Sequence, residues 1–487
     1  MVPNVIWALV FGCLRAWGAG SWQGNFGRRN FFGGNGVWFS LAFFRGEFFF
    51  FSVKQTLLIF ELRMIGDAIM SLPFVRAARE RFEVRVVCAP GCVAVFETVL
   101  AKENVIAWQP PWLAESGKYA WRRWRECGLR TLVRRVREVR AEVAVSVWAD
   151  ARVHVLLALS GARERVGFPM LAVNHYASHL AWRRRQLVGG AVLNSVAGLV
   201  LGRRLLTRKL VRANYRQHHV ENWRQLAEAL GLAWDVATPW FAGALGEISP
   251  NDGGQVEERN RGRSAEPCPP SPVADGPCRA MLGAPIHGEG VRSSENILAN
   301  VSAVVSENIR GVVARARAAG RAVWLVHPGG RVPEQRWALE NFERVIREVL
   351  LPAGVLVLVV KPPEISFGPQ WEGLAPVIAP GNLAELFAVV GLAEVLLCND
   401  TGVAHVAAAW GKRVVGIFTA SEPDWFAPWG SREDVVRQAV CVHHPCLGRC
   451  VMPRVICREA VTVELVAARV RQVLAERAVA VGSRGAV

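Results

Sequence analysis

The chain has 487 residues, of which 52% are hydrophobic and 20% charged; this composition excludes a disordered protein and leaves room for two or three folded domains. The 58 Lys and Arg residues outnumber 41 Asp and Glu residues, and the net charge of +17 favours an anionic partner: nucleic acid, membrane surface or phosphorylated substrate. The alternative is that the arginines only cover solvated helix faces. Eleven irregularly spaced cysteines argue against the disulfide framework of a secreted protein.

Residues 1–53 differ in composition from the rest of the chain. They are rich in Gly, Phe and Trp, and no acidic residue precedes Glu47. The apolar run at 5–13 is too short to span a bilayer. We expect either an interfacial membrane anchor or sequence translated from a start codon placed too early. The second interpretation is favoured, with Val53 as an alternative start, because a strand–loop–helix pattern begins at Lys54.

Residues 54–245 are predicted to form a Rossmann-like domain, because short apolar strands alternate there with helical periodicity. The predicted strands are 56–60, 84–88, 143–147 and 164–168, and the predicted helices are 68–82, 121–140 and 219–230. Residues 246–294 are rich in Pro and Gly and have few apolar anchors, so we expect a disordered linker or insertion.

Residues 295–487 repeat the alternation and predict a second Rossmann-like domain. The predicted helices are 295–319, 339–349, 383–390 and 463–477, and the predicted strands are 322–326, 355–360, 395–398 and 414–418. Two doubly wound parallel sheets give an α/β fold class.

Three loops at the carboxyl ends of strands could build one site. The first contains Gly66, which permits a sharp turn, and Asp67 at the start of a helix. The Asp67 carboxylate either interacts with the helix dipole or acts as a general base across an interdomain cleft.

The second loop reads His327-Pro-Gly-Gly-Arg331 and leads to Arg336-Trp337. Gly329 and Gly330 let the backbone approach a phosphate, and Arg331 and Arg336 can neutralise it with forked donors. Glu364 follows the next strand and either accepts hydrogen bonds from ribose hydroxyls or is a plain exposed loop residue.

The third loop is the most informative part of the chain, because an apolar strand runs into Asp400-Thr401-Gly402 and a small-residue helix begins there. Several backbone N–H groups and the positive end of the helix dipole then point at one spot, which suits the phosphates of a nucleotide. Thr401 adds a hydroxyl, and Asp400 and His405 face the same mouth.

Several common site motifs are missing. The chain has no phosphate-binding P-loop, no Gly-x-Gly-x-x-Gly after its first strand and no Asp-x-Asp pair, so we predict neither a metal nor a cofactor. A cysteine cluster near the C-terminus, with His443 and His444 beside it, lacks the spacing of a zinc finger and holds either a metal or plain buried thiols. Its members are Cys441, Cys446, Cys450 and Cys457.

Together these loops resemble glycosyltransferase family 9, the ADP-heptose:lipopolysaccharide heptosyltransferases, whose fold is GT-B. The resemblance rests on the Gly66-Asp67 loop, on His327-Pro-Gly-Gly with Arg336-Trp337, and above all on Asp400-Thr-Gly-Val-Ala-His405-Val-Ala-Ala-Ala-Trp-Gly411. It spans about residues 54–474 without the 246–294 stretch. Gln335 stands where the family usually has Lys.

The resemblance implies an inverting transfer of heptose from ADP-heptose to a lipopolysaccharide core acceptor, with Asp67 as the base. Gly66 would shape the acceptor loop, and the donor would be held by Gly329, Gly330, Arg331, Arg336, Glu364, Asp400, Thr401, Gly402 and His405. It also implies a cytoplasmic enzyme, peripheral at the inner membrane face, that acts on an anionic glycolipid. The alternatives are a related transferase with another sugar or acceptor, and an inactive nucleotide-sugar-binding protein. A nucleic-acid-binding role lacks any recognisable motif.

Overall fold

The computed structural model describes residues 29–32, 38–44, 47–113, 121–169, 200–201, 203–211, 217–241, 306–333, 336–442, 450 and 452–484. The predicted linker at 246–294 lies outside the described residues, as do Gln335, His443, His444 and Cys446. Contacts divide the chain into two compact units, Met1–Gln55 and Thr56–Val487. The three boundaries between the four segments drawn from the sequence stay predictions.

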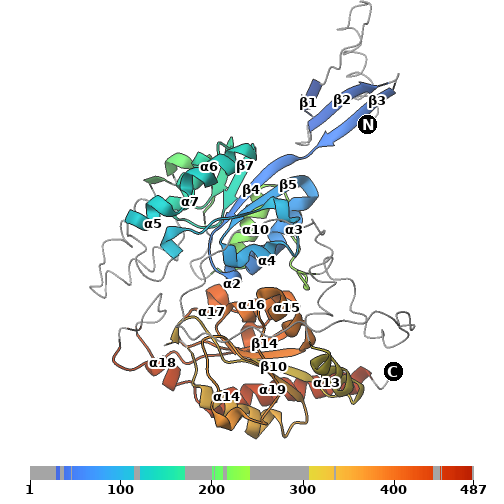
Figure 1. Ribbon diagram of the computed structural model, residues 1–487, viewed down its shortest axis with the longest axis vertical. Coiled ribbons are helices and arrows are strands. Elements are labelled where there is room, and N and C mark those ends of the chain that lie inside the picture. Colours follow the sequence, from blue (N-terminus) through green and yellow to red (C-terminus); the bar gives the residue numbers. More distant parts are fainter. Residues whose placement is uncertain are drawn as a thin grey trace, which may run out of the picture. The chain divides into compact units, whose positions relative to one another are not determined.

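The first unit contains an antiparallel sheet of three strands in the order β1-β2-β3 (Figure 1). The strands are β1 (Arg29–Phe32), β2 (Trp38–Phe44) and β3 (Glu47–Val53). Trp38 pairs with Val53 and Phe44 with Glu47. The sequence analysis assigned no strands here, although runs of aromatic residues favour a pleated sheet.

The N-terminal half of the second unit is built on a six-stranded sheet in the order β6-β5-β4-β7-β8-β9, with parallel pairing at the four strand pairs that are resolved. The strands are β4 (Gln55–Glu61), β5 (Phe82–Cys88), β6 (Val105–Ala107), β7 (Val143–Ser146), β8 (Glu164–Gly167) and β9 (Arg208–Lys209). The helices are α2 (Ile65–Met70), α3 (Leu72–Arg81), α4 (Val93–Phe96), α5 (Trp121–Glu126), α6 (Leu129–Glu138), α7 (Ala151–Leu159) and α10 (His219–Ala229).

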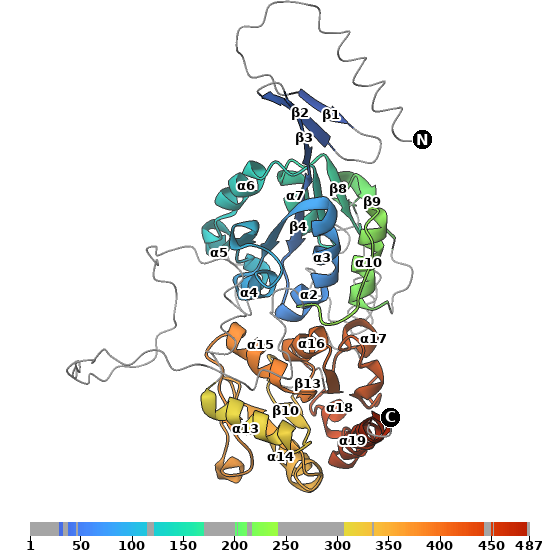
Figure 2. The same cartoon turned by 90° about the vertical axis from the view of Figure 1, so that its right-hand side faces the viewer.

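Helices cover both faces of this sheet. Leu57 and Ile59 on β4 belong to the core with α3 and α10, whereas Leu58 and Phe60 belong to the core with α6 and α7. This division follows from the period of two along a strand. Helices α3 and α10 lie side by side (Figure 2), with Phe74 and Trp223 rings 5.1 Å apart.

The C-terminal half repeats the plan with a parallel sheet in the order β12-β11-β10-β13-β14-β15. The strands are β10 (Val323–His327), β11 (Leu356–Val360), β12 (Val377–Ile378), β13 (Val395–Asn399), β14 (Arg413–Ile417) and β15 (Val435–Val436). The helices are α13 (Glu307–Ala318), α14 (Leu339–Val345) with a π-helical turn at Ile346–Leu350, α15 (Leu383–Leu392), α16 (Gly402–Ala409), α17 (Pro423–Phe426), α18 (Ile456–Glu459) and α19 (Val463–Arg484).

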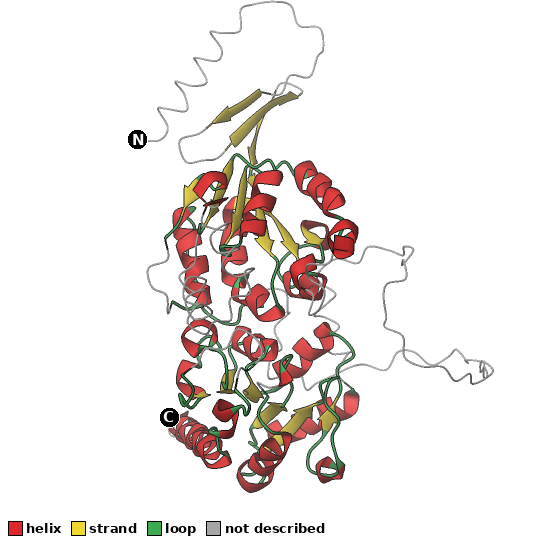
Figure 3. Ribbon diagram, turned by 90° about the vertical axis from the view of Figure 1, so that its left-hand side faces the viewer, coloured by secondary structure: helices red, strands yellow, loops and turns green. Residues whose placement is uncertain are grey.

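The predicted fold class, α/β of the GT-B type with two Rossmann-like parallel sheets, is therefore confirmed, and Figure 3 shows strands enclosed by helices in both halves. The predicted helix 68–82 is instead two helices that meet at Ser71, because Pro73, in the first turn of the second helix, has no N–H to continue the first one. The predicted helix 121–140 breaks at Gly128, which has φ +68°.

A short segment after α10 connects the two halves through buried contacts. Trp240 donates its backbone N–H to Ala409 O at 2.6 Å. The Phe241 ring packs against Phe387 and Trp410, each 5.3 Å away between centroids. In the described part of the chain, no helix is long and apolar enough to cross a membrane.

Candidate functional site

The first loop joins β4 to α2 and carries the proposed base. Asp67 is half-buried, and its Oδ2 accepts the backbone N–H of Met64 at 3.2 Å. Burial raises the pKa of Asp67 above its ordinary value, while the charge of Arg63, the Met64 N–H and the charge of Arg331 act in the opposite direction. A carboxylate with a raised pKa is a better proton acceptor than an exposed one.

A second carboxyl lies beneath this loop and was not predicted as a site residue. Glu61 ends β4 with none of its surface exposed, and both of its oxygens accept the indole N–H of Trp148, at 3.1 and 3.0 Å. The Arg63 backbone N–H also donates to it at 3.2 Å. Burial and the nearby charge of Asp67 raise the pKa of Glu61 well above its ordinary value. The available sequence signal was an acidic residue, Glu61, directly after the apolar strand 56–60.

The second loop is fastened to the neighbouring strand by Asn399, another residue that sequence reasoning missed. Its Nδ2 donates to Pro328 O at 2.7 Å and Gly329 O at 3.2 Å, and its Oδ1 accepts the Trp337 N–H at 2.9 Å. Asn399 is 1% exposed. One buried amide therefore sets the shape of the loop and the path of the chain after it.

Glu364 closes the same loop from the other side. Its Oε1 accepts the Gly330 N–H at 3.1 Å and lies 3.9 Å from Arg336 Nη2. Arg336 Nε donates to Gly330 O. Gly329 has no room for a side chain, since an added Cβ would lie 2.5 Å from Pro362 Cγ. Arg331 is exposed and completes the predicted set in this loop.

The third loop caps α16. Thr401 is the N-cap residue and Gly402 the first helical residue. Among the described residues, the buried Thr401 Oγ1 has no hydrogen-bond partner. A buried hydroxyl without a partner, at the positive end of a helix, is where an anion oxygen would bind.

The two histidines of the second and third loops, His327 and His405, carry no charge near pH 7. Burial lowers the pKa of His405 to about 3, with a further contribution from His218, and lowers the pKa of His327 to about 4, so both imidazoles are neutral near pH 7. Asp400 accepts a hydrogen bond from Ser421 Oγ. Burial raises the pKa of Asp400 to about 6, with a further contribution from the charge of Asp67.

The three loops meet. A Cβ added at Gly66 would lie 2.6 Å from His405 Cδ2, and one added at Gly402 would lie 3.5 Å from Ile65 Cβ. On the other side, a Cβ at Gly330 would lie 3.6 Å from Thr401 Cγ2. Helix α2 of the first sheet thus packs directly on α16 of the second.

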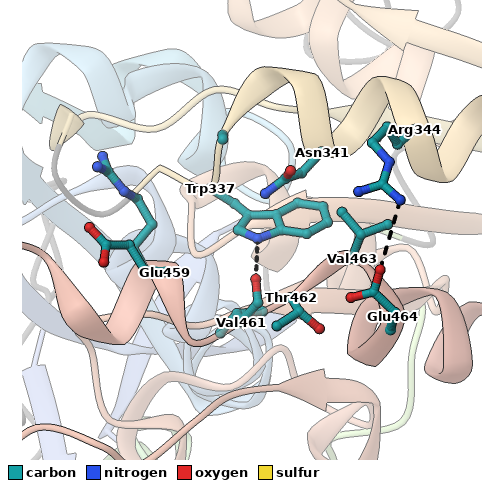
Figure 4. A pocket seen from close by; sticks show the side chains of 10 residues that line it. Trp337, Asn341, Arg344, Glu459, Val461, Thr462, Val463 and Glu464 are labelled. Carbon is teal, nitrogen blue, oxygen red and sulfur yellow. Dashed lines mark hydrogen bonds and ion pairs between the residues drawn. The ribbon is translucent and has the colours of Figure 1, made fainter.

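A cavity in the C-terminal half lies beside Trp337, and its lining residues include none of the predicted site residues (Figure 4). Figure 4 shows the Trp337 indole with its N–H donated to Val461 O at 2.6 Å, and Arg344 turned toward Glu464 at 3.8 Å. Asn399 joins Trp337 to the second loop, because its side-chain amide forms hydrogen bonds with the backbone of both. In the described ranges, no cluster of three or more His, Cys, Asp or Glu residues could hold a metal ion.

Residues 300–455 match the family model "Glycosyltransferase family 9 (heptosyltransferase)", and this segment contains every predicted donor residue. This segment of the chain is therefore similar to glycosyltransferase family 9. The predicted resemblance to the family is confirmed, and with it the prediction of a glycosyltransferase. A search of the curated proteins found no match.

Solved structures of family 9 proteins are similar to the chain at low identity. They include ADP-heptose lipopolysaccharide heptosyltransferase II of E. coli (15% identity, 87% of this chain, 99% of that chain, TM-score 0.47). Another is E. coli heptosyltransferase WaaC with ADP (13% identity, 78% of this chain, 92% of that chain, TM-score 0.46). A third is the glycosyl transferase family 9 protein of Veillonella parvula DSM 2008 (15% identity, 78% of this chain, 85% of that chain, TM-score 0.46).

Proposed function

We propose that this protein is an inverting glycosyltransferase that moves a heptose from ADP-heptose to a lipopolysaccharide core acceptor, with Asp67 as general base. The family 9 match supports glycosyl transfer, and the three loops supply the groups that such a reaction needs. In this proposal residues 54–245 bind the acceptor and residues 295–487 bind the nucleotide sugar.

The contact between Gly66 and His405 is the observation that carries the proposal. It places the residue before Asp67 against the helix whose N-terminus would bind the diphosphate. A base and an anion site that meet across a packed interface are what transfer from a nucleotide sugar requires.

In the proposed reaction, Asp67 accepts the proton of an acceptor hydroxyl while that oxygen forms a bond with the anomeric carbon. The bond from the anomeric carbon to the diphosphate oxygen breaks on the opposite side, and ADP leaves. The Thr401 hydroxyl and the first N–H groups of α16 stabilise the charge on the leaving group. Arg331 and Arg336 add positive charge from the second loop.

The donor-side contacts narrow the roles of individual residues. His405 is neutral, so it contributes packing or a hydrogen bond rather than charge. Glu364 already accepts the Gly330 N–H, so contact with a ribose hydroxyl would use its remaining acceptor capacity. The acceptor would be an anionic glycolipid reached from the inner membrane face, in keeping with the net charge of +17.

The test is ADP release by the full-length protein with ADP-heptose and heptose-deficient lipopolysaccharide core. Asp67→Asn should lower kcat by about 10²- to 10⁴-fold without weakening ADP binding in calorimetry. Asp235→Asn, which removes a similar charge from an exposed position in the same half, is the control and should leave turnover unchanged.

Each of the other possible results would contradict a different part of the proposal. Acceptor-dependent turnover that survives in Asp67→Asn would refute the assigned base. ADP binding without turnover would favour another sugar or acceptor, or an inactive binding protein. An absence of ADP binding would refute the nucleotide site.

A further inference from the structure

Arg63 lies in the loop between β4 and α2, four residues before Asp67, and the mechanism above gives it no role. Its side chain is exposed, and its Cζ lies 3.9 Å from the centroid of the Trp148 ring. A guanidinium over an indole face is held by a cation–π interaction and keeps its edge N–H donors available.

The indole beneath Arg63 is itself held in place. Trp148 is 7% exposed, donates its N–H to the buried Glu61 carboxyl, and stacks on His219 with centroids 4.5 Å apart and an interplanar angle of 27°. Two groups stacked on one ring must lie on opposite faces. Both faces of Trp148 are therefore covered, which leaves the guanidinium, and not the indole, as the group that meets a ligand.

The Arg63 guanidinium forms no ion pair and donates no hydrogen bond within the described part of the chain. Its neighbour Arg152 differs, because Nε of Arg152 donates to Asp150 Oδ1 at 2.8 Å and its Cζ lies 4.7 Å from the Trp112 ring centroid. The positive charge of Arg63 nevertheless acts on the base, since it opposes the rise in the pKa of Asp67. Arg63 is thus a fixed cation with open donors beside the reacting position.

We propose that Arg63, held on Trp148, binds a phosphate or carboxylate group of the acceptor next to the hydroxyl that Asp67 deprotonates. Forked N–H donors match the two oxygens of either anion. This inference rests on the proposed function and assigns acceptor specificity to one residue.

Binding of an anion would also strengthen the base. The anion neutralises Arg63 and so removes the positive charge that stabilises the Asp67 carboxylate. The acceptor would then raise the proton affinity of Asp67 when its own hydroxyl is in place. Arg63→Gln mimics this neutralisation without an anion, so the acid limb of kcat/KM should move to higher pH in that variant.

The experiment compares the full-length protein with Arg63→Gln, Arg63→Lys and the control Arg134→Gln. Arg134 lies on α6 with its side chain 73% exposed, so the control removes one charge from the same half. The acceptors are intact heptose-deficient core oligosaccharide, the same oligosaccharide without phosphate, and the same with its carboxylates esterified.

Arg63→Gln should raise KM for the intact acceptor by about 10- to 100-fold, the loss expected for charge-assisted hydrogen bonds, and leave KM for ADP-heptose unchanged. One of the two modified acceptors should give the unmodified protein the same raised KM that Arg63→Gln has for the intact acceptor. The group that this acceptor lacks is the anion that Arg63 binds. Arg63→Lys should fall between the two, and Arg134→Gln should match the unmodified protein. An unchanged KM in Arg63→Gln, or an equal loss with every acceptor, would overturn the proposal.

A failure of the proposed function is distinguishable from a failure of this site. If the unmodified protein transfers no heptose, calorimetric titration with intact core oligosaccharide alone still tests the site. Binding that Arg63→Gln weakens and Arg134→Gln does not would support it. Equal binding by both variants would overturn it.

Discussion

Gly66→Ala is the sharpest test of the contact between the two halves of the second unit. The added Cβ would lie 2.6 Å from His405 Cδ2 and 3.2 Å from His405 Nε2. Ordinary contacts begin at 3.4 Å, so the loop or the imidazole must move by about 0.8 Å. The imidazole is 6% exposed inside α16 and has little space to yield.

The expected cost has two parts. Overpacking of a buried contact of this kind lowers the free energy of unfolding by about 1–3 kcal/mol. A displacement of nearly 1 Å between base and donor site should lower kcat by up to about 10²-fold. The assays are urea unfolding and ADP release with saturating substrates.

Two controls separate sterics from the loss of a glycine. At Gly91 an added Cβ would meet nothing within 4 Å, so Gly91→Ala should leave both measurements unchanged. Gly402→Ala lies in the same interface but adds only an ordinary 3.5 Å contact with Ile65, so its stability loss should be the smaller. A Gly66→Ala protein with unmodified stability and kcat would show that α2 and α16 do not pack this way during turnover.

Three further outcomes are expected. Asn399→Asp would place a carboxylate against the two carbonyl oxygens that now accept hydrogen bonds from the Asn399 amide. ADP binding should weaken about 10-fold in calorimetry, and the free energy of unfolding in urea should fall by about 2 kcal/mol. The pKa of Asp400, about 6, means that its carboxylate is ionised at higher pH and repels a diphosphate, so ADP affinity should rise as the pH falls through 6. Asp400→Asn should lose this pH dependence and bind ADP more tightly near pH 7.5. Weaker binding by Asp400→Asn would show that Asp400 accepts hydrogen bonds from the donor. Arg413→Ala removes the donors to both oxygens of the fully buried Asp434, at 2.6 and 2.9 Å, and leaves the ion pair of Asp434 with Arg469 at 3.7 Å. Urea unfolding should show a loss of about 2 kcal/mol, and a loss below about 1 kcal/mol would show that Arg469 compensates the buried charge.

The strands that form the centres of both sheets were predictable because they are buried on both faces. Every residue of β10, β11 and β13 is buried, and each strand is an apolar run up to the polar residues that end β10 (His327) and β13 (Asn399). The edge strands β12 and β15 have two residues each and carry no such pattern. Helix α7 was also missed.

The three loops were predictable from local sequence, but the bonds within the site were not. Asn399 binds residues 62–71 positions away, Glu364 binds one 34 positions away, and Trp148 binds Glu61 across 87 positions. Such contacts depend on which loops a fold brings together. No periodicity or turn signal in one segment predicts them. The sequence therefore left Glu364 as either a ribose contact or a plain exposed loop residue, and it left Asn399 and Glu61 out.

The polar groups of the site are of two kinds: some form hydrogen bonds within the protein, and others do not. Asn399 and Glu364 use their hydrogen bonds to hold the second loop, whereas, among the described residues, the Thr401 hydroxyl and the Arg63 guanidinium have no hydrogen-bond partner. Proteins seldom leave a buried hydroxyl unpaired, and a cation held on an indole is preorganised for an anion. One open group lies on the loop that caps α16 and the other on the Asp67 loop, and Gly66 and His405 hold these loops in contact. Two anions, one from each substrate, would therefore bring the donor and the acceptor together at Asp67.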